Sequence, residues 1–536
     1  SSDVCSSDLA RTTNNERNDP QMSASREKNK RKELAQSGIQ DDQSQKKGMS
    51  KGGKTALTVV IAVIVVAAIV FFSLLSTGFF AKHTTAATVG GHKLTPAMVN
   101  YYANDAYTNF SSSYGTYASM FFDTNTPLSK QYVDADKQQS WYDYFVEQGL
   151  QTAAKSYAVY DEAIANGFTL TEEQESALQT QLSTLNSYAA LYGYNNTDAF
   201  LVARFGAGSS LKSYEQFLRV STVAQYYASS LNEARTYTTE QIDAEYTENA
   251  NNYDGVTYRS FYFAKSSYAT ENESGEELTE EQQKEQSALQ MAAAKADADA
   301  MLAAISDEQS FADQALIHAP EDSKSDYEDD TATLSSDKLY SACPSDIAEW
   351  LFDTARAEGD TDCIEGESGY YVVYFISRDT HDEITKNVRH ILIPVSDSTD
   401  EELVASAQSK AAELLSQFLA GDDTSEEAFE KFSNDLLEAG TASEATKYES
   451  VYPGQMVESF ENWCYDESRQ PGDTGIVDST YGSHIMFFCG NSEKTYRDVL
   501  VENALRQADY SAWFENATKD ASYTISSFGI AFTNKF

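Results

Sequence analysis

Two of the six histidines occur in short runs that have the composition of β-strands. His390 stands in VRHILI and His484 stands in GSHIMFF. A neutral imidazole carries one hydrogen-bond donor and one acceptor, so two of them can form an ordered network whose tautomers are fixed by their neighbours. Met456 and Phe460 lie four residues apart at the start of a predicted helix, and they therefore share one apolar face.

Motifs for other kinds of chemistry do not occur in the sequence. It contains no HExxH, GxSxG or CxxC pattern. The glycine-rich stretch GAGSS (206–210) follows no predicted strand and precedes no lysine, so it is not typical of a phosphate-binding loop. Metal-dependent and nucleophilic catalysis therefore have no support, and we expect no metal site and no cofactor.

The region that carries the two histidines belongs to an internal repeat. WLFDTARAEGDT (350–361) and WCYDESRQPGDT (463–474) share Trp, Asp, Arg, Gly, Asp and Thr at an offset of 113 residues, and the same offset carries Gly369 onto Gly482. These two glycines open strand-like runs rich in β-branched and aromatic residues. Upstream, YRSFYF resembles VRHILI at an offset of 130 residues.

The elements that position the histidines are predicted to be the same in both copies. Each copy begins with a short strand and continues with a helix. This helix is predicted at about 278–305 in the first copy, where it is rich in Ala and Gln, and at about 400–420 in the second, where apolar residues recur at helical spacing. A second helix, a third helix around the tryptophan and a last strand follow. The first copy has Ser260 at the place of His390 and Tyr371 at the place of His484.

The second copy, roughly 386–491, resembles the parvulin family of peptidyl-prolyl isomerases. The resemblance rests on four segments in order, VRHILI, AFEKFSND, YPGQMVESFENWCYD and PGDTGIVDSTYGSHI. It implies an enzyme that rotates prolyl peptide bonds and needs neither a metal nor a cofactor. The sequence departs from the family at AGTASEATKYES (439–450), where a glycine-rich loop is expected before Gly454.

The resemblance also implies roles for single residues. His390 and His484 match the paired histidines on adjacent central strands, and Ser479 matches the residue that ties this pair into a network. Asp435 matches the acidic or thiol group that faces the substrate. The residues implied to bind the substrate are Met456 and Phe460, which match the pocket for the proline ring, together with Gln455 and Tyr481.

The charge of the chain is strongly negative and unevenly distributed. It contains 39 Lys and Arg against 83 Asp and Glu, a formal net charge of −44. Residues 1–54 have a net charge of +3, and residues 81–536 have a net charge of −47. A protein that binds a nucleic-acid duplex carries a basic face, so we expect no nucleic acid as a partner.

Residues 55–80 are predicted to span a membrane. These 26 residues contain no charge, and a helix of about 20 residues crosses the hydrocarbon core. Nine Lys and Arg precede the segment between 26 and 54, so the positive-inside rule places the N-terminus in the cytoplasm and residues 81–536 outside.

The region from 86 to 255 is predicted to be helical. The stretch 138–167 has aromatic and aliphatic residues at three- and four-residue spacing and ends in glycine. TVGGHKLTPAMVNYYANDAY (88–107) resembles the opening of the chaperone domain in extracytoplasmic foldases of the SurA and PrsA type. In such foldases the end of the chain packs back on the chaperone domain, which implies the same for a helix and short strand in 493–536.

These expectations define an α+β protein with a transmembrane helix, a helical chaperone domain and two tandem parvulin-like domains, the first of them degenerate. The expected parts are a basic, disordered cytoplasmic tail at 1–54, the transmembrane helix at 55–80, the chaperone domain at 81–255, the degenerate parvulin-like domain at 256–381, the parvulin domain at 382–492, and the C-terminal helix and strand at 493–536.

Three functions fit the sequence. The first is a membrane-anchored foldase that binds unfolded, proline-containing secreted polypeptides and isomerises their prolyl bonds. The second is a holdase in which both parvulin-like copies bind peptide without turnover. The third is a membrane scaffold with helical docking surfaces. A prolyl isomerisation assay separates the first function from the other two.

The cysteines leave two states open. Cys343 and Cys363 bracket a helix-to-strand passage in the first copy, and Cys464 and Cys489 do so in the second. In an oxidising exterior each pair can form an intradomain disulfide, and the alternative is four buried free thiols.

Overall fold

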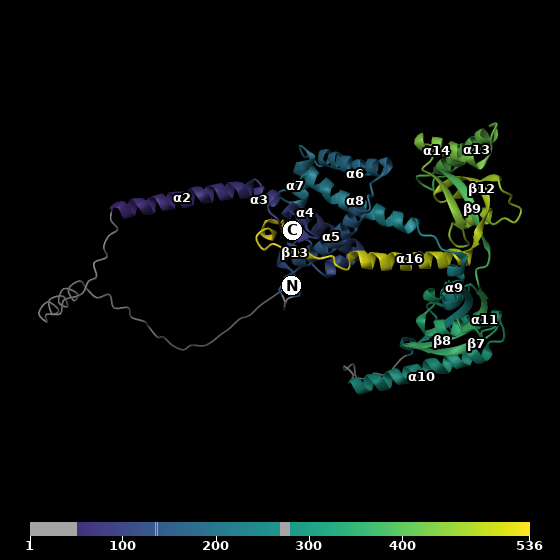
Figure 1. The fold of residues 1–536 in the computed structure, drawn as a ribbon. Coiled ribbons are helices and arrows are strands. Elements are labelled where there is room, and N and C mark those ends of the chain that lie inside the picture. The colour runs from purple at the N-terminus through teal and green to yellow at the C-terminus, as the bar shows by residue number, and fades with distance from the viewer. Residues whose placement is uncertain (1–50, 135, 137, 269–278) are drawn as a thin grey trace, which may run out of the picture. The chain divides into compact units, whose positions relative to one another are not determined.

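The computed structural model describes residues 51–134, 136, 138–268 and 279–536, and it divides the chain into two units, 1–84 and 85–536. In the first unit the structure describes α2 (Lys51–Ser76) and α3 (Phe79–His83), drawn in purple in Figure 1. Val59–Ser76 has a mean hydropathy of 3.1, and by length and composition it is able to cross a membrane. The predicted span 55–80 is thus helical to Ser76. All but the last four residues of the predicted tail 1–54 lie outside the described residues.

Six α-helices dominate the region between 85 and 253. They are α4 (Pro96–Tyr114), α5 (Trp141–Ala165), α6 (Glu172–Leu191), α7 (Thr197–Phe205), α8 (Leu211–Glu233) and α9 (Thr239–Asn249). Shorter elements accompany them, namely η1 (Gly115–Met120), η2 (Leu128–Lys130), β3 (Tyr132–Asp134), β4 (Gln139–Ser140) and η3 (Ala250–Asn252). Side chains at N-caps fix several helix starts, as where Ser140 accepts a hydrogen bond from the backbone N–H of Asp143.

The core of this helical body lies between α4, α5 and α8. Tyr101, Tyr142 and Phe145 are among its largest buried side chains. Gly149 allows α4 and α5 to approach closely, because a Cβ at this position would lie 2.6 Å from the carbonyl carbon of Tyr102. A larger residue at this position would force the two helices apart.

The C-terminal segment returns to the helical body. α16 (Tyr496–Thr518) contacts α5, where Trp513 donates a hydrogen bond from its Nε1 to Glu162 over 3.0 Å. The segment then forms β13 (Tyr523–Ile525), which pairs with β1 (Ala87–Val89), and β1 pairs with β2 (His92–Leu94). After η7 (Ile530–Phe532), the ring of Phe536 packs against the body's core. Residues from both ends of this unit therefore build one domain.

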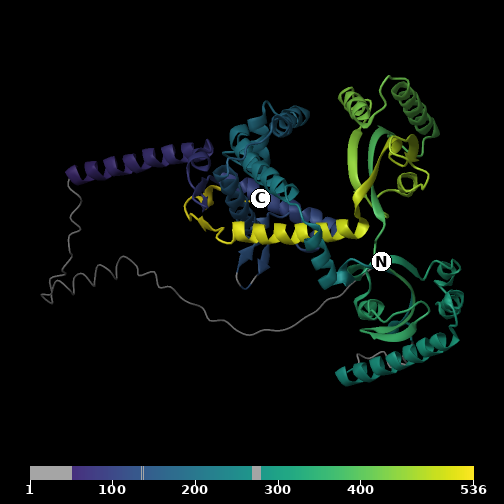
Figure 2. The same cartoon turned by 45° about the vertical axis from the view of Figure 1, so that its right-hand side comes forward.

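Two four-stranded antiparallel sheets lie between α9 and α16 in the sequence, and they have equivalent strand orders. Figure 2 shows the region of the first sheet in teal and that of the second in green to yellow. The first sheet has the order β6-β5-β8-β7, with β5 (Gly255–Ala264), β6 (Leu334–Leu339), β7 (Thr361–Gly366) and β8 (Gly369–Asp379). The second sheet has the order β10-β9-β12-β11, with β9 (Ile384–Pro394), β10 (Glu444–Val451), β11 (Thr474–Ser479) and β12 (Gly482–Thr495). The predicted repeat is therefore a repeat of fold, and the α+β class is confirmed.

Helices cover both faces of each sheet in the same way. The helices of the first copy are α10 (Glu280–Ala304), α11 (Glu308–His318) and α12 (Ser345–Leu351), with η4 (Lys265–Ser267), η5 (Lys324–Tyr327) and η6 (Tyr340–Ala342). Those of the second copy are α13 (Glu401–Leu419), α14 (Glu426–Glu438) and α15 (Glu458–Cys464). Each sheet separates two cores, one under the first two α-helices of its copy and a smaller one under the third.

The cysteines of each pair lie in different cores. Cys343 packs with Ile347 under α12, whereas Cys363 packs on the other face of the first sheet. Cys464 and Cys489 are separated by the second sheet in the same way. All four are free thiols, so the structure corresponds to the second of the two states that the sequence left open, while Cys5 lies outside the described residues.

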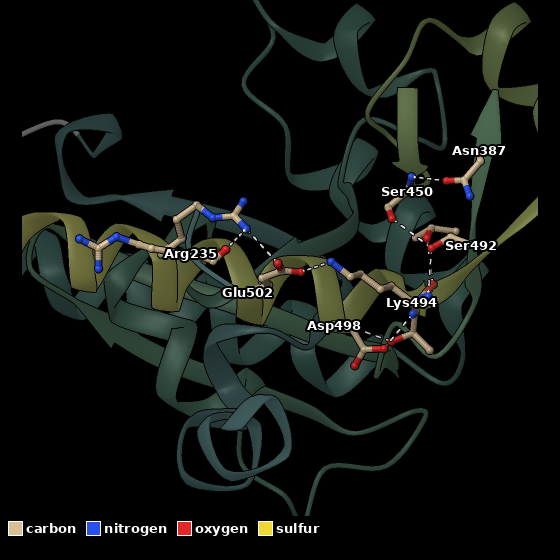
Figure 3. A network of polar contacts seen from close by, with 10 residues as sticks. Arg235, Asn387, Ser450, Ser492, Lys494, Asp498 and Glu502 are labelled. Carbon is tan, nitrogen blue, oxygen red and sulfur yellow. Dashed lines mark hydrogen bonds and ion pairs between the residues drawn. The ribbon is translucent and has the colours of Figure 1, made fainter. Parts of the chain in front are cut away.

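A polar network joins the second sheet to α16 (Figure 3). Glu502 on α16 is buried, and it pairs with Lys494 at the end of β12 and with Arg506 one turn further along the helix. Arg506 also donates to the carbonyl of Arg235, which follows α8. At the sheet, the hydroxyl of Ser450 lies 3.0 Å from that of Ser492.

Candidate functional site

The two central strands of the second sheet place His390 and His484 side by side. β9 and β12 are antiparallel neighbours in which His390 is opposite Met486 and His484 is opposite Leu392. Side chains alternate between the faces of a sheet, so both imidazoles share the face that α15 covers. Their ring centroids are 5.3 Å apart, and their Nδ1 atoms are 3.1 Å apart.

A row of hydrogen bonds extends from this pair in both directions. The Nε2 of His390 lies 3.2 Å from a carboxylate oxygen of Glu444, and the Nε2 of His484 lies 2.7 Å from the hydroxyl of Ser479. We call Glu444, His390, His484 and Ser479 the histidine row. At its ends, the hydroxyl of Tyr448 donates to Glu444 over 2.7 Å, and the backbone N–H of Tyr481 donates to Ser479 over 3.1 Å.

With Glu444 ionised and both imidazoles neutral, the row has one consistent proton order. The carboxylate of Glu444 accepts a hydrogen bond from the Nε2–H of His390, which leaves the Nδ1 of His390 as an acceptor. His484 therefore donates from its Nδ1 to His390, and its own Nε2 accepts the hydroxyl proton of Ser479. Each side chain in the row fixes the tautomer of the next.

The electrostatics of the row favour these protonation states. Burial lowers the pKa of His390, against the opposing effect of Glu444. Burial and the neighbouring His390 lower the pKa of His484 to about 4. The hydroxyl of Tyr448 lowers the pKa of Glu444. At neutral pH the row therefore holds two uncharged imidazoles and one carboxylate.

A cavity of about 300 Å³ opens over the histidine row. Phe460 meets both imidazoles edge-to-face, at 5.6 Å from His390 and 5.7 Å from His484, and Tyr448 stacks on His390 at 5.1 Å. The lining consists of His390, Leu392, Glu444, Tyr448, Gln455, Met456, Val457, Phe460, Tyr481 and His484. The cavity thus combines an apolar slot with hydrogen-bonding groups of fixed orientation, and it can hold a small apolar ring next to an amide.

The structure brings together seven of the eight site residues expected from the sequence. Six of them line the cavity, namely His390, His484, Met456, Phe460, Gln455 and Tyr481. The seventh, Ser479, does not line the cavity but forms a hydrogen bond with His484. Among the described residues, no cluster of three or more His, Cys, Asp or Glu side chains is arranged to hold a metal ion.

Asp435 is not among the residues that line the cavity. It lies exposed near the end of α14, whose Phe429 packs into the core on the opposite face of the sheet from α15. The carboxylate at the cavity belongs to Glu444, which the sequence reasoning missed. Glu444 lies within 439–450, the stretch that departs from the glycine-rich pattern, and this stretch forms most of the edge strand β10.

The first sheet lacks the histidine row at the equivalent place. Ser260 is opposite Val373 and Tyr371 is opposite Tyr262, which is the register that His390 and His484 have in the second sheet. The rings of Tyr262 and Tyr371 lie 4.4 Å apart. The first copy therefore repeats the fold with an aromatic pair instead of the imidazoles.

Comparison with known families identifies the second copy. A family described as "PPIC-type PPIASE domain" matches residues 370–488, a range that contains the two histidines and the whole cavity lining. The chain carries a parvulin domain. The curated protein "Chaperone SurA" of Burkholderia thailandensis is 26% identical over 220 residues, which cover 37% of this chain and 46% of that protein. The chain spans only about half the length of this curated relative.

Solved structures similar to parts of the chain carry PrsA titles. PrsA from Bacillus anthracis is 23% identical, with 26% of this chain and 58% of that chain covered and a TM-score of 0.15. The foldase protein PrsA from Streptococcus pneumoniae is 16% identical, with 43% and 68% covered and a TM-score of 0.17. The parvulin domain itself is identified by its family match over residues 370–488.

Proposed function

We propose that the parvulin domain catalyses the cis–trans isomerisation of prolyl peptide bonds. The proposal rests on one observation, the histidine row beside the apolar slot of Met456 and Phe460. The slot suits the proline ring in size and polarity. The hydrogen bonds within the row fix the orientation of both imidazoles beside the slot, and such preorganised polar groups are effective at stabilising a transition state.

The reaction makes and breaks no covalent bond. Amide resonance gives rotation a barrier of about 18–20 kcal/mol, and each decrease of about 1.4 kcal/mol accelerates the reaction tenfold. The twisted amide is less conjugated and less polar than either planar isomer. An apolar slot that removes water from the amide therefore favours the twisted form, provided that the polar groups around it match that form better than the planar one.

We further propose that the chain is a membrane-anchored foldase whose clients are unfolded secreted polypeptides. The apolar helix Val59–Ser76 and the excess of basic residues before it support an anchor with residues 81–536 outside the cytoplasm. Protease added to intact cells is expected to degrade residues 81–536 and to spare the N-terminal tail. Protection of the large region would contradict this topology.

An assay of prolyl isomerisation with the full chain in detergent tests the enzyme. We expect acceleration of a proline tetrapeptide and a loss of at least about tenfold in kcat/KM for His390→Ser, since this change imitates the first copy. Ser260→Ala in the first sheet is the matched control and should leave the rate unchanged. Circular dichroism must show that both variants are folded. An unchanged rate in folded His390→Ser would contradict the proposal.

The alternative is a holdase that binds peptides without turnover, and one observation favours it. A cavity of about 650 Å³ in the helical body is lined by Tyr188, Tyr192, Tyr194, Phe200, Ala203 and Arg204. An accessible aromatic surface of this kind suits apolar segments of unfolded chains. If the full chain suppresses aggregation of an unfolded client but shows no isomerase activity, the holdase replaces the enzyme.

A further inference from the structure

The lining of the parvulin cavity contains a single ionised side chain. All ten lining residues are described by the structure, and neither Lys nor Arg is among them. His390 and His484 are neutral near pH 7, because burial lowers the pKa of both. Glu444 therefore supplies the only formal charge within the cavity, and that charge is negative.

The carboxylate of Glu444 is accessible as well as ionised. Its side chain is 39% exposed, although one of its oxygens receives hydrogen bonds from both His390 and Tyr448. Those bonds come from neutral donors and leave its charge uncompensated. Tyr481, 63% exposed at the rim, adds an aromatic face of the kind that attracts cations.

The nearest cation along the strand does not neutralise this charge. Lys447 is three residues after Glu444 on β10, so its side chain points to the opposite face of the sheet. There it pairs with Glu426 on α14 and with Glu449. Residues 382–492 contain 6 Lys and Arg and 22 Asp and Glu, so the field of the whole domain has the same sign as the cavity.

We propose that the parvulin domain selects prolyl bonds that have lysine or arginine beside the proline, with Glu444 as the specificity-determining residue. This inference rests on the proposed binding of proline in the slot of Met456 and Phe460. When the proline of a bound peptide lies in that slot, the residue next to the proline lies near Glu444, because consecutive residues of an extended chain are about 3.3–3.6 Å apart. A basic side chain at that point gains a charge partner, whereas an acidic or phosphorylated one is repelled.

The test compares peptides that differ only in the charge beside the proline. The full chain in detergent is assayed with Ala-X-Pro-Phe and with Ala-Pro-X-Phe, where X is Lys, Ala or Glu. We expect kcat/KM for Lys to exceed that for Glu by at least about tenfold in one of the two series at low salt. At 0.5 M NaCl the ratio should fall to about threefold or less, because the screening length shortens to roughly 4 Å.

Two variants test whether Glu444 causes the preference for lysine beside the proline. Glu444→Gln keeps one acceptor oxygen, which can receive the hydrogen bonds of both His390 and Tyr448, but removes the charge, so the ratio of Lys to Glu peptides should approach one. Glu449→Gln is the matched control, because Glu449 lies on the same strand, is 73% exposed and belongs to the group around Lys447. It should retain the wild-type ratio. A ratio near one in both peptide series for the wild-type chain, or an unchanged ratio in Glu444→Gln, would overturn the inference.

Binding of the same peptides, measured by fluorescence anisotropy, separates this inference from the proposed enzyme. Peptides that bind with the Lys preference but are not isomerised would contradict the enzyme and support the charge selection. Isomerisation without preference would support the enzyme and contradict the selection. Absence of both binding and turnover would contradict both.

Discussion

The surroundings of three buried histidines in this chain shift their pKa values in opposite directions. His390 and His484 are buried against apolar rings, and burial lowers the pKa of both. His381 is also buried, but its two ring nitrogens lie 2.7 Å from two acceptors, the carbonyl of Tyr253 and the carboxylate of Asp337. Two acceptors require two donors, so these contacts favour the imidazolium and raise the pKa of His381.

The lowered pKa values of the histidine row predict a flat pH profile. Isomerase activity of the wild-type chain should be constant from pH 8 to about 6 and should fall only as the pH approaches about 4, where His484 becomes protonated. Protonation turns the Nε2 of His484 from an acceptor into a donor, so it no longer accepts the hydroxyl hydrogen of Ser479 and the order of the row is lost. A steady-state profile of kcat/KM measures this directly. A midpoint near 6.5, the ordinary pKa of histidine, would show that the imidazoles are not held neutral.

Substitutions of two residues that line the cavity should have different effects, one mainly on the stability of the fold and the other mainly on peptide binding. Phe460 is 2% exposed and belongs to the core under α15, so Phe460→Ala should lower the free energy of unfolding by about 3–5 kcal/mol. Met456 is only half-buried, and Met456→Ala should mainly weaken binding of proline peptides, by about 1–3 kcal/mol. Urea denaturation and peptide titration give the two quantities. Equal effects on stability would contradict the assignment of Met456 to the slot.

Spacing along the sequence predicts most of the cavity but not its carboxylate. The histidines follow from two strand-like runs, and Phe460 lies on a helix as predicted. The helix face predicted to carry both Met456 and Phe460 is wrong, because α15 begins at Glu458 and Met456 lies in the bend before it, from where it still lines the cavity. Glu444 reaches His390 only because Thr446 of β10 pairs with His390 of β9, a register between strands that no local pattern specifies. Asp435 satisfied the motif, but the packing of α14 places it away from the cavity.

At the scale of elements, the helices and central strands could be predicted and the edge strands could not. The predicted helix 400–420 corresponds to Glu401–Leu419, because its apolar residues recur at helical spacing. β10 has the sequence EATKYESV, in which Glu, Thr, Lys and Ser are mixed with Ala, Tyr and Val, so neither face is apolar along its length. Such charges are common on edge strands, where they oppose pairing with other chains. They also remove the alternation of apolar and polar residues by which a strand is predicted from the sequence.

The position of each cysteine pair across a sheet predicts the absence of intradomain disulfides. In a chain with Cys5→Ser, titration of the denatured protein should yield four thiols with and without prior reduction. In the native protein these thiols should react slowly, because burial raises the pKa of Cys363 to about 11 and those of Cys464 and Cys489 to about 12. Two fewer thiols without reductant would show a bridge and require a rearranged sheet.

The stability of the fold around the segment between β8 and β9 should depend strongly on His381. This residue is 1% exposed and packs against Tyr496 at the start of α16, with ring centroids 4.3 Å apart and the rings tilted by 41°. His381→Ala should cost about 2–4 kcal/mol of unfolding free energy, since it leaves a buried carbonyl without its donor. His92→Ala is the matched control, because His92 forms a comparable pair with Asp161 in an exposed position, and we expect a loss below about 1 kcal/mol.

Because the pKa of His381 is raised, its contribution to the free energy of unfolding should decrease with increasing pH, and thermal denaturation can measure this. Its stabilisation is fully present below the ordinary histidine pKa of about 6.5, and it is lost as the pH rises through the raised value of the folded state. The difference in stability between wild type and His381→Ala should therefore shrink with increasing pH. A difference that grows with pH would contradict the charged state.

At the scale of the whole molecule, the helical body should require the C-terminal segment. Deletion of residues 519–536 removes the pairing of β13 with β1 and exposes the core against which Phe536 packs. We expect a lower melting temperature and rapid proteolysis within the helical body. Lys535→Ala, an exposed position in the same segment, should have no effect. A truncated chain with wild-type protection would show that the returning segment is dispensable.

The pairing of β1 with β13 also sets an order of events during synthesis and export. The ribosome makes β1 (Ala87–Val89) long before β13 (Tyr523–Ile525), and both parvulin-like sheets emerge in between. Each of those sheets uses strands from its own continuous stretch, so each can fold while the rest of the chain is still being made. The helical body cannot close until the last strand arrives. Until β13 has been made, β1 has an unpaired strand edge on the side that β13 covers in the folded protein, and the helical body is open to non-native contacts with other chains.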